Sequence, residues 1–378
     1  MRSKTNSVGL KVAATFALLM TVTFFTTVQA QITTAIRGTV VDQQDKAVVD
    51  ASVKITHTAS GTVSLASSNE NGVFSARGMR VGGPYSVEIS GSGFSAVRID
   101  DLYLALDRTL NLPVTVQAET TLEEIVVTGT RRSVGYENKG LGTDFGIEAL
   151  EEVASIDRDI TDAAAQNPFA IVNVQSGGAK ELTIAGANNR FNSLTVDGVA
   201  LNDRFGLNAN GYPTQRSPIS YDAIESLSIQ TAPFDVEYNG FTGGTINAVT
   251  KSGTNEFFGS VAYYSTDDSL IGDKNKDQDF NFTFEEETTV ATLGGPIIQD
   301  KLFFFVAYDK YEEIAPLQNG PLGSGALNIQ QDITLDDVAE VRGIVSDVWG
   351  FDIGGFNKAP AQDEKILANV DWNINDAH

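Results

Sequence analysis

Few side chains of this chain are suited to bind a metal ion or to attack a substrate. The 378 residues include two histidines and no cysteine, which excludes disulfides and thiolate metal sites. Zinc hydrolysis needs about three protein ligands, usually histidines with a carboxylate, and only His57 and His378 are available. His57 lies in a strand pattern, where we expect an ordinary surface histidine. We therefore predict no catalytic residue, no metal site and no cofactor, and a protein that is not an enzyme.

Residues 122–130, LEEIVVTGT, indicate binding through backbone groups instead of catalysis by side chains. They have the β-branched composition of a buried strand, yet they lie between an acidic stretch and the pair Arg131-Arg132, with no packed element obvious on either side. An exposed strand with free N–H and C=O groups can pair with the edge of a partner's sheet. A second interpretation stays open, in which these residues are the last strand of the preceding domain or the first strand of the following one.

The charge of the chain limits its partners. Lys and Arg number 26 against 49 Asp and Glu, which gives a net charge of −23. A chain this acidic repels phosphate backbones, so we expect no nucleic-acid partner. Hydrophobic residues make up 42% of the sequence, enough for two or three domains that each bury a core.

The N-terminus predicts export. MRSKTNSVGLK is a basic region, VAATFALLMTVTFF is an apolar region too short to span a bilayer, and small residues precede a cleavage point between Ala30 and Gln31. We expect residues 1–30 to be a removed signal peptide, with a retained membrane anchor as the alternative. Any other membrane crossing must use strands, because no further long apolar run occurs in the sequence.

Residues 31–117 alternate in short apolar bursts separated by Gly, Asn, Asp and Pro. Seven short strands spaced by turns predict a small β-sandwich. The layout runs G-x-V-x-D, A-x-V-x-I, N-G-x-F and then G-x-Y-x-V-x-I-x-x-x-G-F. It resembles the carboxypeptidase regulatory-like domains. The scarcity of histidine argues that this sandwich is a module without peptidase activity.

A linker over 118–144 and a compact α+β block over 145–254 are expected next. Apolar residues at helical spacing predict a helix that ends at Asn167-Pro168; they are Ile147, Leu150, Val153, Ile156, Ile160 and Ala163 or Ala164. Three further segments follow, which read ELTIAGANNRFNSLTVDGVALND, IESLSIQTAPFDVEYNGFTGG and GTINAVTKSGTNEFFGS.

These segments resemble, in order, the plug-domain signatures of the TonB-dependent outer-membrane receptors. The resemblance implies that Glu124, Ile125, Val126, Val127 and Thr128 form the TonB box, which binds a TonB-type energy-coupling protein. The linker around it can extend to roughly 90 Å, so a partner can find the strand and pull on it. One departure is Ile184-Ala185-Gly186, where the family has Ile-Arg-Gly, so no arginine role is carried over.

Residues 255–378 predict the first strands of a transmembrane β-barrel. The four candidates are FFGSVAYY, TTVATLGGPII, KLFFFVAYDKY and KILANVDWNIND. In the last, apolar residues alternate with Asn369, Asp371 and Asn373, which fits lipid outside and water inside. The connections run long, short, long, as expected of outer loops and periplasmic turns. GGPIIQDKLFFFVAYDKY resembles a hairpin of the Oar-like receptors, a branch that also carries the regulatory-like sandwich; strands of a soluble sandwich are the alternative.

The expected fold is mainly β: a seven-stranded β-sandwich, an α+β plug and an incomplete barrel. Bacterial barrels need about eight strands or more, so we expect the sequence to be the N-terminal part of a longer receptor, with its last strand left unpaired. The expected function is ligand uptake across the Gram-negative outer membrane, with the sandwich and plug toward the periplasm.

The expected partners are a TonB-type protein, outer-membrane lipid and an unknown extracellular ligand. Siderophore, cobalamin, oligosaccharide and peptide or protein ligands all stay open. The alternative function is a secreted or surface adhesion protein built on the sandwich, which needs neither a donor strand nor a plug.

Overall fold

The computed structural model describes residues 34–106, 108–118, 125–128, 135–137, 140–155, 158–174, 180–233, 241–270, 274–275, 278–279, 284–315, 317–354 and 360–373. The predicted signal peptide, with its cleavage point between Ala30 and Gln31, lies outside these residues. No helix in the part of the chain that the structure describes is long and apolar enough to cross a membrane.

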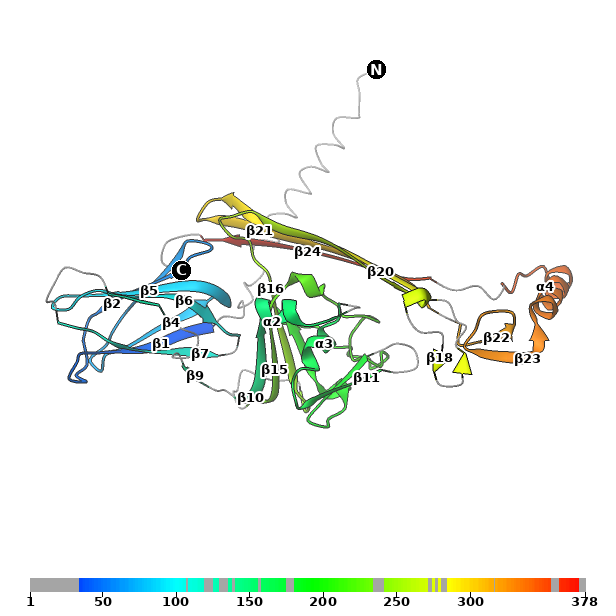
Figure 1. Ribbon diagram of the computed structural model, residues 1–378, viewed down its shortest axis with the longest axis horizontal. Helices are drawn as coiled ribbons and strands as arrows, with labels where there is room; N and C mark the ends of the chain where they lie inside the picture. Colours follow the sequence, from blue (N-terminus) through cyan, green and yellow to red (C-terminus); the bar gives the residue numbers. More distant parts are fainter. Residues whose placement is uncertain are drawn as a thin grey trace, which may run out of the picture.

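The N-terminal part, which we call the sandwich, packs two sheets face to face (Figure 1). The strands of one sheet are, in spatial order, β4 (Val73–Met79), β1 (Thr34–Val41) and β7 (Thr109–Thr115). Those of the other are β3 (Thr62–Ser67), β2 (Ser52–His57), β5 (Gly82–Ser90) and β6 (Val97–Leu104). Alternate side chains such as Ile36, Ile55 and Phe74 fill the core between the sheets. The predicted seven-stranded sandwich is confirmed.

Each sheet of the sandwich also receives a strand from the linker. β8 (Ile125–Thr128) pairs in parallel with β6, and β9 (Gly135–Glu137) pairs antiparallel with β7. The sequence pattern predicted no strand at β9. It predicted β8, but only one of the two interpretations placed that strand on the sandwich.

The second part, which we call the plug, is a five-stranded mixed sheet with a two-stranded sheet and short helices beside it (Figure 1). The sheet runs in the order β10 (Gly140–Gly146), β15 (Ile224–Pro233), β16 (Thr245–Thr250), β13 (Ser193–Val196) and β14 (Val199–Ala200). The remaining elements are α2 (Ile147–Glu152), α3 (Ile160–Ala164), β11 (Ala170–Val174), β12 (Lys180–Ile184), η1 (Asn189–Phe191) and η2 (Tyr221–Ala223).

The single helix predicted at the start of the plug is wrong. The chain forms α2 and α3 with a break between them, in which Arg158 has a left-handed φ of 51°. Asp159 then caps α3, because its side chain accepts a hydrogen bond from the backbone N–H of Thr161 at 2.8 Å. The apolar spacing continues through the break, which is why the pattern looked like one helix.

The third part, which we call the wall, is an antiparallel meander of four long strands. They are β17 (Phe258–Asp267), β20 (Glu285–Ile298), β21 (Leu302–Ile314) and β24 (Pro360–Trp372), and they form an open sheet in the part of the chain described. Ile366, Val370 and Trp372 are exposed on one face of β24, whereas Asn369 and Asp371 on the other face contact the plug and the sandwich. The predicted barrel strands and their alternation are confirmed.

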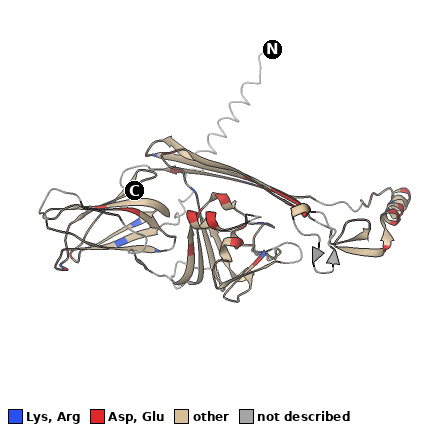
Figure 2. Ribbon diagram, in the orientation of Figure 1, with Lys and Arg blue, Asp and Glu red and all other residues tan. Residues whose placement is uncertain are grey.

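The connections between wall strands differ at the two ends. Only a short turn around Asp300 joins β20 to β21. The long connections hold η3 (Asp268–Leu270), β18 (Lys274–Asn275) and β19 (Gln278–Asp279), and then β22 (Asn319–Leu322), β23 (Asn328–Thr334) and α4 (Leu335–Trp349). In Figure 1 the sandwich lies at the short-turn end and α4 at the opposite end. Figure 2 shows acidic residues on the plug, the wall and α4, with no single acidic region.

The plug packs against the inner face of the wall. Phe305 and Ala307 of β21 belong to the same buried apolar cluster as Ile184, Leu227 and Ile246 of the plug. The neighbouring Phe303 and Tyr311 are buried as well. Phe305 is therefore a core residue of a contact between plug and wall, which differs from the closed soluble core of the alternative interpretation.

Candidate functional site

The predicted partner-binding strand is held by the sandwich. Ile125 pairs with Val97, Val126 with Arg98, Val127 with Ile99 and Thr128 with Asp100, all in parallel register. Glu124 lies outside the described residues. One edge of this strand is therefore paired, which the expectation of an open strand did not include. The alternative interpretation, in which IVVT is the last strand of the sandwich, describes this paired edge.

The other edge of β8 faces no strand among the described residues, because β8 is outermost in the order β3-β2-β5-β6-β8. The pairing with β6 is also short. After Asp100, Asp101 has a left-handed φ of 59°, and the register of β5 and β6 shifts between Tyr85 and Val87. Such a bulge bends a strand and ends its pairing. Four residues of β6 therefore form the whole acceptor edge for β8.

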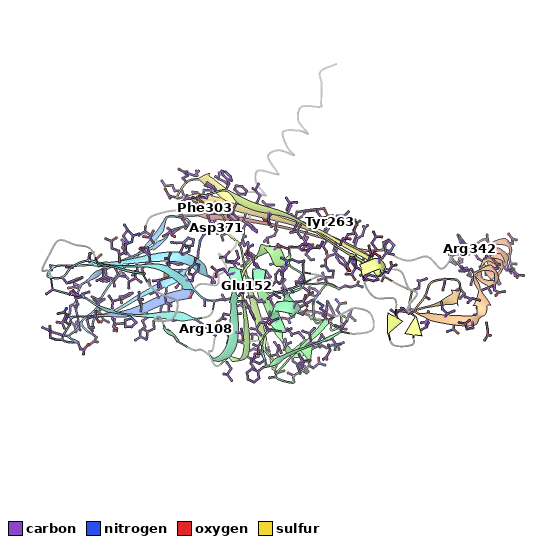
Figure 3. All side chains as sticks on the ribbon, viewed as in Figure 1. Arg108, Glu152, Tyr263, Phe303, Arg342 and Asp371 are labelled. Carbon is purple, nitrogen blue, oxygen red and sulfur yellow. The ribbon has the colours of Figure 1, made fainter. Side chains whose placement is uncertain are left out.

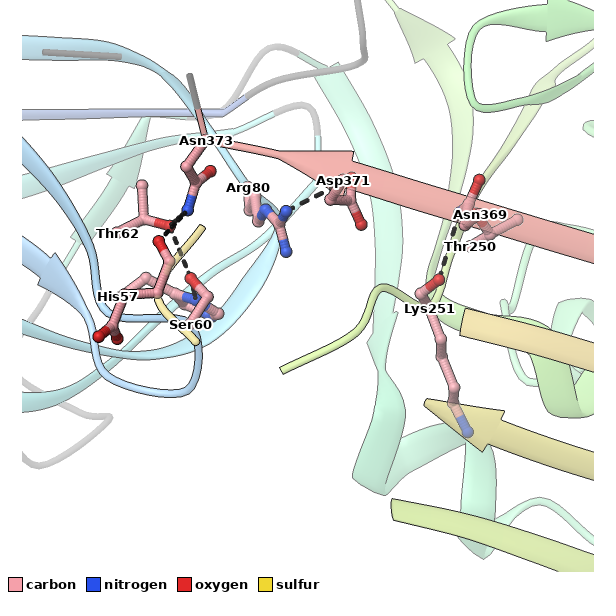
Figure 4. A network of polar contacts seen from close by, with 10 residues as sticks. His57, Ser60, Thr62, Arg80, Thr250, Lys251, Asn369, Asp371 and Asn373 are labelled. Atoms are coloured by element: carbon pink, nitrogen blue, oxygen red, sulfur yellow. Dashed lines mark hydrogen bonds and ion pairs between the residues drawn. The ribbon is translucent and has the colours of Figure 1, made fainter. Parts of the chain in front are cut away.

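The sandwich is fastened to the wall by polar contacts at the short-turn end, shown in Figure 4. Arg80 Nη2 lies 3.4 Å from Asp371 Oδ1, and the Arg80 guanidinium lies 6.0 Å from the ring centroid of Phe303. Asn373 Nδ2 donates to Thr62 Oγ1 at 2.9 Å. Figure 3 places Phe303 and Asp371 together at this end of the wall and Arg342 at the other.

A buried histidine lies behind this contact. His57 Nδ1 is 2.7 Å from Ser60 Oγ, and Ser60 Oγ is 2.7 Å from Thr62 Oγ1, so a chain of hydrogen bonds runs from Asn373 into the sandwich. Burial, with a smaller contribution from the nearby Arg80 charge, lowers the pKa of His57 to about 4. The prediction of a surface histidine is wrong, since the side chain packs inward beside the ring of Tyr85.

The turn between β20 and β21 joins the same contact. Asn255 Nδ2 donates to Asp300 Oδ1 and the Asp300 backbone N–H donates back to Asn255 Oδ1, each at 2.8 Å. The Asn255 backbone N–H donates to the carbonyl of Ala59 at 2.8 Å. The sandwich, the wall turn and the connection between plug and wall therefore meet here. No group of three or more His, Asp or Glu side chains suited to a metal ion occurs in the described part of the chain.

A second arginine fastens the sandwich to the plug. The Arg108 guanidinium pairs with the carboxylate of Asp144 on β10, and Arg108 Nη2 donates to the carbonyl of Gly142 at 3.3 Å. Both side chains are largely withdrawn from water, where a charged hydrogen bond is stronger than on an open surface. The sandwich is thus held to the wall by Arg80 and to the plug by Arg108.

The plug is in turn held inside the wall by polar side chains. The Arg216 guanidinium stacks 3.6 Å from the ring centroid of Tyr311 and lies 3.6 Å from Asp363. Asn369 Nδ2 of β24 donates to Thr250 Oγ1 at 2.6 Å. These contacts are spread over the plug and the inner face, so they hold the plug at more than one place.

Known families match the three parts. Residues 35–117 match the Carboxypeptidase regulatory-like domain, residues 148–245 the TonB-dependent Receptor Plug Domain, and residues 249–320 an Outer membrane beta barrel domain. The TonB-dependent transporter Oar of Myxococcus xanthus is 29% identical over 238 residues, which cover 60% of this chain and 22% of the relative.

The chain carries the plug domain of the TonB-dependent receptors. A further relative, the Probable TonB-dependent siderophore receptor PirA of Acinetobacter baumannii, is 29% identical over 163 residues, or 40% of this chain and 20% of that protein. The crystal structure of PirA aligns with a TM-score of 0.38 and 23% identity over 47% of this chain and 25% of that structure. The chain therefore spans about a fifth of the length of the curated relatives it matches, 22% and 20%.

These matches fix the setting of the protein. It is an outer-membrane protein with its plug toward the periplasm, and the relatives that it matches are transporters and receptors and not enzymes. The short-turn end of the wall, where the sandwich docks, is accordingly its periplasmic end.

Sequence reasoning missed the residues that fasten the parts of the receptor together. Arg80 and Arg108 lie in or beside turns of the sandwich and carry no motif, and their partners Asp371 and Asp144 are remote in sequence. The inward-facing acids of β24 were the available signal, because a buried carboxylate in a barrel wall calls for a cationic partner. The pattern did not say which part of the chain supplies it.

Proposed function

We propose that this chain forms the periplasmic and plug-bearing portion of an active transporter that takes up an extracellular ligand. The single observation that carries the proposal is the packing of the plug core against the inner face of the wall, with Phe305 and Ala307 buried against it. A filled barrel passes no ligand until its plug moves. Because that movement breaks buried contacts, it requires an energy input.

The energy enters through Glu124, Ile125, Val126, Val127 and Thr128, which pair with the edge of a periplasm-spanning TonB-type protein. A short linker strand supports this role, since its pairing with β6 covers only four residues and can be exchanged for pairing with the sheet edge of a partner. We propose the division of the chain at about residues 30, 117, 144 and 254 into signal peptide, sandwich, linker with donor strand, plug and wall.

The ligand is an extracellular molecule that passes only when the plug moves. One relative is named as a siderophore receptor, and the other carries no ligand in its name. An adhesion protein built on the sandwich needs neither a plug nor a wall, and no feature of the described residues favours it over transport.

Binding of the coupling protein tests this proposal. The probe is the purified periplasmic domain of the host's own TonB-type protein, and the receptor is the full-length protein in detergent. Val126→Pro removes a backbone donor from the strand and resists strand pairing, so we expect binding to fall at least tenfold. Thr121→Pro, placed in the same linker outside the donor strand, is the control and should bind like the unsubstituted receptor. Equal binding by both variants would remove the coupling role from residues 124–128.

A further inference from the structure

We propose that the edge of β6 from Val97 to Asp100 is a strand-acceptor site whose occupant is the donor strand of the same chain. In the resting receptor this site holds Ile125–Thr128 away from the coupling protein, which must take the strand off β6 to pull on it. Without β8, these four residues of β6 would form an open sheet edge with unpaired backbone groups. We call this control of access to the strand gating. Gating rests on the proposed function, whereas the strand pairing does not.

The chain itself delivers the donor strand to this edge. After β7, the backbone N–H of Ser95 donates to the carbonyl of Gln117 at 3.0 Å, and Phe94 and Ala118 form an isolated β-bridge. These contacts bring the linker to the residues directly before β6. Only residues 119–124 then separate Ala118 from β8. A tether this short gives the strand an effective concentration on the order of millimolar at the β6 edge.

The pairing is built to be reversible. It covers four residues and ends where Asp101 bends β6 at its positive φ. A strand addition this short is marginal by itself. It persists because the tether keeps the strand close, and a partner with a longer acceptor edge competes with it.

The acceptor edge is fixed relative to the barrel. Arg80 fastens the sandwich to Asp371 of the wall, and Arg108 fastens it to Asp144 of the plug. A donor strand on β6 is therefore held at the periplasmic rim and cannot extend away from it. Release converts the paired residues 125–128 into free linker, which lengthens the reach of the chain toward the inner membrane.

A disulfide across the two strands tests the pairing. The native chain has no cysteine, so Arg98→Cys with Val126→Cys introduces the only two thiols at positions that are direct register partners. Glu88→Cys with Val126→Cys is the matched control, because Glu88 pairs with Arg98 from the far side of β6 and lies one strand further away. Two strand spacings are about 10 Å, beyond the reach of a disulfide.

We expect the Arg98/Val126 pair in the full-length receptor to form the disulfide at least tenfold more completely than the Glu88/Val126 pair. Similar yields for the two pairs would overturn the docking site. This readout needs no coupling protein, so it holds or fails independently of the proposed function.

The gating role is tested with the same Arg98/Val126 protein in its oxidised and reduced forms. The periplasmic domain of the host's TonB-type protein should bind the oxidised form at least tenfold more weakly than the reduced form. Equal binding would show that the partner adds to the outer edge of β8 without displacing it, which contradicts gating. If the unsubstituted receptor also fails to bind, the proposed function is wrong and gating falls with it, while the disulfide yield still decides the pairing.

Discussion

Arg80 and Asp371 form an ion pair that joins the sandwich to the inner face of the last described wall strand, with 3.4 Å between Nη2 and Oδ1. Both side chains are mostly withdrawn from water, at 19% and 14% exposure. Removing one partner leaves the other charge partly buried without compensation. The pair therefore helps to hold the acceptor edge of β6 at the periplasmic rim.

Asp371→Asn should loosen the sandwich from the wall by about 1–2 kcal/mol, because the Arg80 charge loses its partner. Hydrogen exchange of residues 57–62 in the full-length receptor measures this opening. Asp352→Asn, which breaks an exposed pair with Arg342 at the opposite end, is the control and should leave the exchange of residues 57–62 unchanged. Equal effects of the two substitutions would contradict a specific role for Arg80 and Asp371.

The stability of the sandwich should fall as the pH drops from about 6.5 toward 4, because of His57. Its folded pKa of about 4 lies below the ordinary histidine pKa of 6.5, so the unfolded chain takes up the proton first. The contribution is complete above about pH 6.5 and is lost as the pH falls through the folded pKa, by at most roughly 3 kcal/mol. Thermal unfolding between pH 7 and 4 measures this slope, and His57→Gln should flatten it. An unchanged slope in that variant would assign the pH dependence to other groups.

Gly253→Ala should disturb the connection between plug and wall at the point where it packs against β20 and β21. An added Cβ at Gly253 would lie 2.3 Å from the carbonyl oxygen of Phe304 and 2.8 Å from that of Gly295. Backbone atoms cannot move aside cheaply, so we expect a loss of about 2–4 kcal/mol, read as a lower thermal midpoint of the purified receptor.

Gly343→Ala is the matched control for that substitution. Gly343 lies within α4, and an added Cβ there meets no atom within 4 Å. Alanine in a helix interior is favoured over glycine by about 0.5–1 kcal/mol, so this variant should be as stable as the native receptor or more so. A drop in midpoint as large as that of Gly253→Ala would mean that the close approach at Gly253 is not the cause.

The parts of the fold that sequence predicted are those with a strong local period. The wall strand with Ile366, Val370 and Trp372 alternates over its whole length, as do β1, β2 and β7 of the sandwich, and each was placed. The hairpin of β13 and β14 turns at Asp197-Gly198, whose φ values of 46° and 79° suit that pair in a tight turn.

The predictions from sequence failed where a single residue or a partner distant in the sequence determines the local structure. The left-handed φ of Arg158 interrupts the predicted helix, and the spacing of apolar residues carries no information about that φ. The position of β8 depends on the free edge of β6, and local composition says only that a strand forms there. The burial of His57 depends on Ser60, Tyr85 and the wall, all of them tertiary contacts.

Hydrogen exchange at the two paired strands tests the central claim most directly. The full-length receptor is measured alone and with a saturating amount of the periplasmic domain of the host's TonB-type protein. The account predicts that residues 97–100 exchange faster in the complex, because their strand partner has left, while residues 125–128 stay protected on the new partner. Unchanged protection of residues 97–100 in a complex that has demonstrably formed would contradict it.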